Sequence, residues 1–421
     1  MILRTIISFR HIGVNMGKKV VWIANEYNGP GTPRTRQILL SQYLRKNGYA
    51  PYIIASSTNN SFTEYKETIS KISYDGENFF VIKAPDYNSN LKRAISSFLF
   101  QRKLWKNRKS LPKPDVIVSD FAGFFGNVFL KWKKKYGTKI IYDILDLWPE
   151  GFVDLGLIKR DGILTKWLYK QEYKSYKNAD SIIFSFKGGK DYIIDKRWDI
   201  ESGGKVDVSN IGYLNNGVDL NYFNVNSINE IFDDPDLQSN CFKAIYLGSM
   251  SLFNGLEIII EAAKILKESG WDSIKFLMFG CGNREYDLKK LAKTYELDNV
   301  TFKGKIDKKY APYVLCHSDV NLFTFKDTNI LKYGVSPNKL FMYFASGKPV
   351  LSMIKPAYDI VEDRKCGISV NNNPQEVANA LIRFASMSKE EYDNFCCNSK
   401  KVAEEYDYKN LVKELIRFIE K

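Results

Sequence analysis

Residues 336–350 read Ser-Pro-Asn-Lys-Leu-Phe-Met-Tyr-Phe-Ala-Ser-Gly-Lys-Pro-Val, and this stretch predicts a helix that begins beside an anion. Ser336 can cap the helix, Pro337 suits its first position, and Gly347 can end it. The unpaired N–H groups of a helix start attract anions, and Lys339 adds a positive charge to that first turn. The stretch therefore predicts a phosphorylated ligand.

On both sides of this stretch, short apolar strands alternate with amphipathic helices, which is typical of parallel α/β architecture. The strands predicted for a first domain are residues 20–24, 50–55, 116–119, 140–142 and 181–185. Those predicted for a second domain are residues 244–247, 275–279, 301–303, 320–323 and 349–353. Each series predicts a doubly wound, Rossmann-like domain that binds ligands at the carboxyl ends of its strands.

The length of the chain also indicates two domains. At 421 residues it exceeds what one hydrophobic core usually supports, so two domains of about 200 residues are expected. The Asn-, Asp- and Gly-rich segment 199–240 is expected to hold the linker, near residues 215–220. The expected divisions are a disordered extension at 1–15, a first domain at 16–214, a second domain at 215–405 and a helix at 406–421. That last helix either packs back on the first domain or makes a local contact.

The cysteines and histidines of the chain limit the kinds of metal, disulfide and catalytic site that it can form. The six cysteines form no Cys-x-x-Cys pair, and the histidines are His11 and His317. This predicts neither a zinc site nor a disulfide framework, and it disfavours a Ser-His-Asp triad, so no metal and no cofactor are expected. The apolar run 6–9 is too short for a signal peptide or a membrane span. A cytoplasmic protein is therefore expected.

The net charge of +14 is unevenly distributed. Residues 90–180 hold 19 Lys and Arg against 9 Asp and Glu, and residues 92–113 hold eight basic residues and no acidic one. Apolar side chains near helical spacing lie among these charges, at Ile95, Phe98, Leu99 and Trp105. One interpretation is a peripheral contact of 92–113 with an anionic membrane surface. The other is an ordinary helix whose apolar stripe faces the core. No recognisable nucleic-acid-binding module accompanies the charge, so nucleic acid is not an expected partner.

Glycine-rich loops follow the first strand of one domain and the second strand of the other. Residues 25–34 include the candidate ligand-binding residues Gly29, Gly31, Thr32 and Arg34. Glycines let the backbone approach a ligand, and Arg34 and Arg36 could meet an anion. In the second domain, Gly280-Cys281-Gly282 precedes Arg284 at a strand end. A connecting turn is the alternative for the first loop, and the second pattern alone is weak evidence.

In this order, these elements resemble retaining glycosyltransferases of family 4, which have the GT-B fold of two Rossmann-like domains facing each other across a cleft. Besides the first glycine-rich loop, the matching stretches are residues 216–219, 246–249, 254–256, 280–282, 300–305 and 336–350. One further stretch, residues 142–151, makes the resemblance more specific within that family. It reads Tyr-Asp-Ile-Leu-Asp-Leu-Trp-Pro-Glu-Gly. It resembles bacterial N-acetylfucosaminyl and related aminosugar transferases of O-antigen and capsule assembly.

The resemblance implies that the second domain binds a nucleoside diphosphate sugar, expected to be UDP-linked. The backbone at Lys305 and Ile306 would recognise the base, and Lys339 with the helix start and Arg284 would bind the pyrophosphate. The implied donor-side residues are Gly248, Ser249, Asn254, Gly280, Gly282, Arg284, Lys305, Ile306, Ser336, Pro337, Asn338, Lys339 and Leu340. The family implies retention without an assigned general base and without a divalent metal.

On the acceptor side, Asp146 and Trp148 are the candidates. Asp146, at a strand end, is interpreted as holding a sugar hydroxyl or facing the reacting centre, so that Asp146 and Lys339 are the candidate catalytic residues. Trp148 is interpreted as stacking on a sugar. The alternatives are a helix cap for Asp146 and a core aromatic for Trp148. The implied acceptor is a growing surface glycan or a lipid-linked sugar, at the inner face of the membrane.

The sequence departs from the family pattern at Gly334 and Met342. Many members carry glutamates at these two positions, and the second commonly meets the ribose hydroxyls. Loss of a hydrogen bond to a charged group costs about 1.5–3 kcal/mol, or roughly 10- to 150-fold in affinity. A catalytically silent nucleotide-sugar-binding or scaffold protein is therefore an alternative. A nucleotide-sugar epimerase is a further one, disfavoured because such enzymes normally use histidine.

Overall fold

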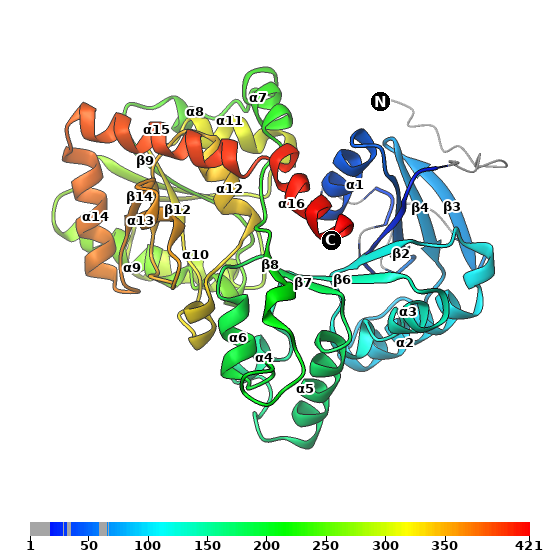
Figure 1. Cartoon of the computed structure of the whole chain (residues 1–421). Helices are drawn as coiled ribbons and strands as arrows, with labels where there is room; N and C mark the ends of the chain where they lie inside the picture. The colour runs from blue at the N-terminus through cyan, green and yellow to red at the C-terminus, as the bar shows by residue number, and fades with distance from the viewer. Residues whose placement is uncertain (1–16, 28, 32–34, 59–64, 66) are drawn as a thin grey trace. The chain divides into compact units, whose positions relative to one another are not determined.

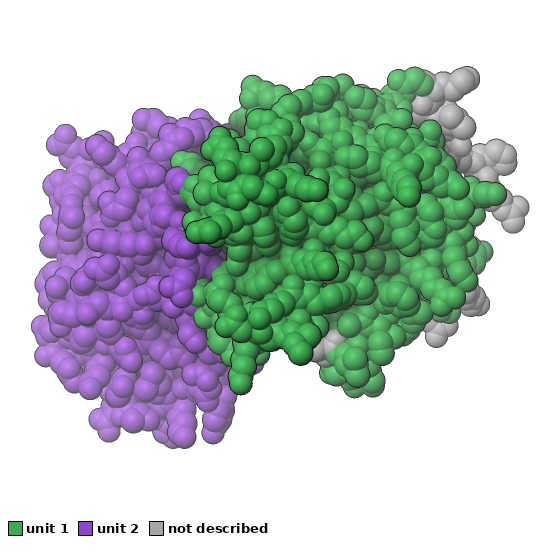
Figure 2. All heavy atoms as spheres, turned by 60° about the horizontal axis from the view of Figure 1, so that its bottom comes forward, with its two compact units in different colours: residues 1–215, 408–421 green, residues 216–407 purple. Residues whose placement is uncertain are grey.

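The computed structural model describes residues 17–27, 29–31, 35–58, 65 and 67–421. Within these residues the chain divides into two compact units, coloured separately in Figure 2. Unit 1 runs to Asn215 and also includes Tyr408–Lys421, whereas unit 2 is Asn216–Asp407. The extension expected at residues 1–15, and the candidates Thr32 and Arg34, lie outside the described residues.

Unit 1 is built on a sheet in which eight described strands lie in the order β3-β4-β2-β1-β5-β6-β7-β8 (Figure 1). The strands are β1 (Val20–Ala24), β2 (Ala50–Ser56), β3 (Ile69–Tyr74), β4 (Glu77–Ile82), β5 (Val116–Ser119), β6 (Lys139–Ile144), β7 (Ser181–Phe184) and β8 (Ile211–Tyr213). The paired strands are parallel except β3, which runs antiparallel to β4. The strand order reverses at β1, which has β2 on one side and β5 on the other. The loops after β1 and β5 therefore flank a topological switch point.

The helices of unit 1 connect these strands and extend to the end of the chain. They are α1 (Arg36–Lys46), α2 (Asn90–Lys106), α3 (Leu130–Tyr136), α4 (Glu150–Asp154), α5 (Ile163–Tyr176), α6 (Gly189–Asp195) and α16 (Tyr408–Glu420), with short 3-10 helices η1 (Arg108–Ser110), η2 (Gly123–Phe125) and η3 (Val208–Asn210). Helix α16 packs against α1 through a buried stripe at helical spacing, which includes Leu411, Val412 and Leu415. Lys19 and Tyr49 both hold Glu420 near its end, at 2.7 and 2.6 Å.

Unit 2 is built on a sheet of parallel strands that lie in the order β11-β10-β9-β12-β13-β14. The strands are β9 (Phe242–Leu247), β10 (Ile274–Phe279), β11 (Val300–Gly304), β12 (Val320–Phe323), β13 (Val350–Ser352) and β14 (Gly367–Ser369). Strands β10 and β11 follow on one side of β9, and strands β12, β13 and β14 follow on its other side. The segments after β9 and β12 thus flank the switch point of this unit.

In unit 2, buried residues of β9, β10, β12, α9 and α14 form a large apolar cluster, and the strands are connected by helices. The helices of this unit are α7 (Leu220–Asn229), α8 (Pro235–Gln238), α9 (Glu257–Glu268), α10 (Glu285–Thr294), α11 (Ala311–Cys316), α12 (Asn338–Ala345), α13 (Ile360–Asp363), α14 (Pro374–Ser386) and α15 (Lys389–Glu405), with η4 (Leu252–Asn254), η5 (Lys308–Tyr310) and η6 (Asn329–Tyr333). No helix in the described part of the chain is long and apolar enough to cross a membrane.

All ten predicted strands are present, with ends that differ by at most two residues. Two strands of unit 1 that escaped prediction, β3 and β4, form a hairpin in which β3 has a mostly half-buried pattern. Strands β8 and β14 also escaped prediction, and each has three residues. The predicted α/β class with two doubly wound domains is confirmed.

Candidate functional site

The helix predicted from residues 336–350 is α12, and its start differs in detail from the prediction. Helix α12 begins at Asn338, with Pro337 in the capping position and no side-chain cap. The predicted cap by Ser336 is wrong, because its Oγ accepts the backbone N–H of Asn216 at 3.1 Å. Gly347 ends the helix as predicted, with φ of 68° and its N–H bonded to Phe344 O.

Lys339 lies in the first turn of α12 and reaches into the switch point of unit 2. Its Nζ donates to Asn254 Oδ1 at 2.7 Å and lies 3.2 Å from the Tyr246 hydroxyl. It also lies 4.8 Å from the ring centre of Tyr246 and 5.5 Å from that of Phe325, which follows β12. The lysine therefore lies between the segments that follow β9 and β12.

The described groups that contact this ammonium are uncharged: aromatic rings, a phenol hydroxyl and an amide oxygen. Burial lowers the pKa of Lys339 to about 7, because removal from water disfavours the charged form. Both of its hydrogen-bond partners are neutral. An anion bound here would supply the missing negative charge and restore the lysine to its ordinary protonation state.

The loops after β9 and β10 are pressed together and accept only glycine at key positions. Gly280 has φ of 135°, and a Cβ on it would lie 1.8 Å from Gly248 O. A Cβ on Gly282 would lie 2.3 Å from Met250 O. The two loops also exchange backbone hydrogen bonds, such as Gly248 N to Phe279 O at 3.0 Å. The predicted Gly-x-Gly thus keeps backbone close to backbone beside the switch point.

Hydrogen bonds among Asn254, Ser249 and Tyr246 hold the groups that contact Lys339 in place. Asn254 is buried, and its Nδ2 donates to Ser249 O at 2.8 Å and to Ser251 Oγ at 3.0 Å. Ser249 O also accepts the Tyr246 hydroxyl at 2.7 Å. With its amide N–H groups occupied, Asn254 must present its oxygen to Lys339. Asn254 therefore positions the ammonium of Lys339.

Other donor-side candidates lie nearby but have other contacts. Arg284 precedes α10 and is paired with Glu257 at 2.7 Å and with Asp287 at 2.8 Å, so its charge is already matched within unit 2. Lys305 and Ile306 follow β11 directly, with Lys305 exposed. On α12, Asn338 is exposed, whereas Leu340 is buried on the core side.

The two positions that depart from the family pattern also differ in structure. Gly334 has φ of 92° and ψ of −179°, a conformation that essentially only glycine adopts, so a glutamate could not occupy this backbone without strain. Met342 lies on α12, one turn beyond Lys339, and is partly exposed.

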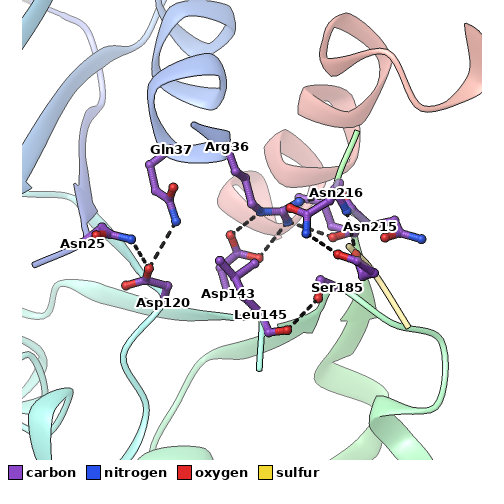
Figure 3. Close-up of polar contacts among 11 residues, drawn as sticks. Asn25, Arg36, Gln37, Asp120, Asp143, Leu145, Ser185, Asn215 and Asn216 are labelled. Atoms are coloured by element: carbon purple, nitrogen blue, oxygen red, sulfur yellow. Dashed lines mark hydrogen bonds and ion pairs between the residues drawn. The ribbon is translucent and has the colours of Figure 1, made fainter. Parts of the chain in front are cut away.

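In unit 1, Figure 3 shows a buried ion pair that corrects the interpretation of Arg36. Its Nε and Nη2 each donate to a carboxylate oxygen of Asp143 at 2.8 Å. Its Nη2 also donates to Leu214 O at 2.8 Å, and its Nη1 to Asn215 O at 2.5 Å. Arg36 is 3% exposed, so it joins α1 to β6 and to the end of unit 1 and does not meet an external anion.

A second polar cluster in Figure 3 lies at the switch point of unit 1. Asp120, directly after β5, accepts hydrogen bonds at Oδ2 from Asn25, directly after β1, and from Gln37 of α1 at 3.2 Å. Its Oδ1 is buried without a hydrogen-bond partner. Burial and the nearby Asp143 raise the pKa of the Asp120 carboxyl well above its usual range. Sequence reasoning missed this residue, although it is the first polar residue after a predicted strand.

The remaining first-domain candidates lie near the same sheet edge. Asp146 lies two residues beyond β6 and contacts solvent, although surrounding protein atoms raise the pKa of its carboxyl. Trp148 is partly exposed and precedes α4. Gly31 is exposed with φ of 85°, and Gly29 is buried.

His317 lies away from both clusters. It ends α11 just before β12, so it is at the amino end of the strand, whereas Lys339 is at the carboxyl edge. Its ring stacks on Tyr313 with centres 4.0 Å apart. The described residues contain no group of three His, Cys, Asp or Glu side chains that could hold a metal ion.

Two protein-family models match successive stretches of the chain. Residues 36–222 match Glycosyltransferase Family 4, and residues 227–402 match Glycosyl transferases group 1. An uncharacterised glycosyltransferase of Methanocaldococcus jannaschii is 24% identical over 254 residues, which are 58% of this chain. The match spans 59% of the length of that relative.

Solved structures share the fold at low identity. Sucrose-phosphate synthase from Thermosynechococcus elongatus has a TM-score of 0.72 at 13% identity, covering 96% of this chain and 98% of its own. HepE from Anabaena in complex with UDP and glucose has a TM-score of 0.66 at 13% identity, covering 96% and 99%. The chain thus matches a model of Glycosyltransferase Family 4 and then a model of Glycosyl transferases group 1, and it has the two-domain GT-B fold.

Proposed function

We propose that the chain transfers a sugar from a nucleoside diphosphate donor, UDP-linked, to a hydroxyl of a glycan or lipid-linked acceptor, with retention. The observation that supports this most is Lys339. A half-buried ammonium with neutral partners, in the first turn of a helix and at a topological switch point, suits a phosphate group. The HepE protein of similar fold has been solved with UDP and glucose.

The site suits departure of a diphosphate. As the bond from sugar to phosphate breaks, negative charge develops on the leaving oxygens. The N–H groups at the start of α12 and the ammonium of Lys339 are fixed in place before the reaction, so they can stabilise that charge without reorganising. Asn254 keeps the ammonium in this position.

The acceptor is proposed to bind at the switch point of unit 1. Hydroxyl groups need donors and acceptors of hydrogen bonds, and Asp120 offers a buried oxygen that lacks a partner. Asp146 lies beyond the neighbouring strand β6. The stretch 142–151 supports an N-acetylated aminosugar as the transferred group and surface polysaccharide assembly as the setting.

The test is turnover. Purified protein would be incubated with UDP-N-acetylhexosamines and saccharide or polyprenyl-linked acceptors, and release of UDP and the glycosylated product would be measured. Product formation that depends on both substrates, and that is lost in Lys339→Ala but kept in the surface control Lys290→Ala, is the expected result. Turnover unaffected by Lys339→Ala would overturn the assignment of this site.

A catalytically silent binding protein of the same pathway is the second candidate, and the observation that favours it is the absence of acidic side chains at Gly334 and Met342. Such a protein would bind UDP-sugars with the same dependence on Lys339. It would neither hydrolyse nor transfer the sugar.

A further inference from the structure

Helix α2 is oriented with polar residues on its inner side. Ser96 and Ser97 are buried, and they bond to the polar segments beneath the helix. Ser97 Oγ contacts both carboxylate oxygens of Glu26 at 2.7 Å, and Ser96 Oγ donates to Pro85 O at 2.7 Å. Because serines occupy this side, part of the apolar stripe of the helix is displaced toward solvent.

The outer side of α2 therefore carries apolar side chains. Leu91 is 73% exposed, and Ile95 and Phe98 are each 49% exposed. Their spacing of four and three residues aligns them on one side of the helix. Only part of the apolar surface faces the core, so the interpretation of α2 as an ordinary core-facing helix is wrong for these side chains.

Helix α5 also carries exposed apolar side chains. Ile163 is 90% exposed and Leu164 is 62% exposed, and Trp167 follows one turn later. Trp167 contacts Phe124 of η2, with ring centres 5.1 Å apart. Both α2 and α5 contact η2. Helices α2 and α5 thus both contact one short segment of unit 1, and we call their exposed apolar side chains the α2–α5 face.

The exposed charges on the two helices themselves are positive, and the exposed Asp161 precedes α5. Exposed cations of α2 include Lys92, Arg102 and Lys106, and those of α5 are Lys166, Lys170 and Lys174. Helix α2 contains no acidic residue. The single acid of α5, Glu172, is fully buried and accepts the Tyr192 and Tyr176 hydroxyls. Neither helix presents a carboxylate to solvent.

We propose that the α2–α5 face lies on an anionic lipid bilayer. Large exposed aliphatic and aromatic side chains, on two helices whose own exposed charges are all positive, fit a surface that offers both acyl chains and negative headgroups. A protein partner complementary to this face would need an acidic rim around an apolar centre, whereas an anionic bilayer offers that combination everywhere. That the face serves to present a lipid-linked acceptor rests on the proposed function, whereas the lipid contact itself does not.

The test is co-sedimentation of the full chain with vesicles of phosphatidylcholine alone or with one third phosphatidylglycerol, at 0.15 M salt and without substrates. We expect binding to the anionic vesicles. Lys166→Glu with Lys170→Glu should weaken partition by about 30-fold or more, since each lysine near such a surface contributes about fivefold. Leu91→Ser with Phe98→Ser should weaken it by about tenfold or more.

Matched variants in unit 2 serve as controls. The charge controls are Lys290→Glu with Lys293→Glu, on α10, and the apolar controls are Ile228→Ser with Tyr286→Ser. All four residues are exposed, and these changes should leave partition unchanged. UDP binding measured on each variant separates this proposal from the proposed function, because loss of lipid contact should not alter it. Binding of wild type to neither vesicle would overturn the proposal. Loss of a self-associated or nucleic-acid-bound state in the α2–α5 variants, without vesicle binding, would assign the face to that partner instead.

Discussion

The two units differ in the ionisable group that lies at the topological switch point of each sheet: a lysine in unit 2 and a carboxyl group in unit 1. In unit 2 the switch point between β9 and β12 holds a lysine whose partners are neutral. In unit 1 the switch point between β1 and β5 holds a carboxyl group whose partners are two amide side chains, and burial raises its pKa. Both groups lie at the carboxyl edge of a parallel sheet, where ligands of this architecture bind.

The difference indicates which ligand each edge suits. An unpaired, partly buried cation is stabilised by an anion such as a diphosphate, and a carboxyl group that favours its neutral form would be destabilised by one. A neutral carboxyl group can donate and accept hydrogen bonds, as a sugar hydroxyl requires. The same architecture, used twice, can therefore suit a charged donor in one unit and an uncharged acceptor in the other, through the side chain at each switch point.

Removal of the cation should have the largest effect. Lys339→Ala is expected to weaken UDP binding by about 2–5 kcal/mol, or at least roughly 30-fold, because a desolvated charge loses its partner. Titration calorimetry measures the affinity, and Lys290→Ala is the matched control. An unchanged affinity would show that the two switch points do not differ in the way described.

Raising the pH should weaken donor binding more gradually. In the empty protein Lys339 has a pKa of about 7, and a bound diphosphate raises it. Below pH 7 the lysine is protonated in both states, whereas above pH 7 binding must take up a proton. The affinity for UDP should therefore fall by up to about tenfold per pH unit above 7. A flat profile from pH 7 to 9 would contradict an unpaired lysine.

The acceptor side can be tested separately. Asp120→Ala should lower kcat/KM for the acceptor by about tenfold or more, through loss of a hydrogen-bonding group, with the UDP affinity unchanged. Asp120→Asn should retain most of the activity, because the raised pKa already favours the neutral carboxyl. If both variants were equally impaired, the negative charge of Asp120 would be needed, and the contrast between the units would fail.

The smallest expected effect is an increase in the affinity for UDP. Met342→Glu adds a carboxylate one turn beyond Lys339, where the family commonly contacts the ribose. UDP affinity should rise by up to about tenfold, and binding of inorganic pyrophosphate, which lacks ribose, should stay the same. A decrease for both ligands would mean that the new carboxylate pairs with Lys339 and competes with the phosphates.

The strand pattern could be predicted because buried parallel strands are largely apolar runs, as in β1, β5 and β12. Strands β8 and β14 have three residues each, one of which is a glycine, and so give a weaker signal. The anion-binding role expected for Arg36 was wrong because its partner, Asp143, is 107 residues away, and sequence does not show which strand lies beside a helix. Ser336 was misassigned for the same reason, since its partner is 120 residues away.

Lys339 was selected as a candidate for a phosphate contact by local reasoning alone, and that role remains a proposal. What local reasoning missed is the environment: aromatic rings from two strand ends and the oxygen of Asn254 surround the ammonium and change its pKa. Asp120 was missed because a single acid after a strand is common, and only the neighbouring Asn25 and Gln37 distinguish it.

The most direct test of the donor site is calorimetric titration of UDP at pH 8 in two buffers that differ in ionisation enthalpy, on wild type and Lys339→Ala. At this pH the heat of buffer deprotonation reports how many protons the complex takes up. The account predicts saturable binding with uptake of up to one proton in the wild type, and weak binding with none in the variant. Tight binding without proton uptake, or equal uptake in both proteins, would contradict the claim that Lys339 is the countercharge of the diphosphate.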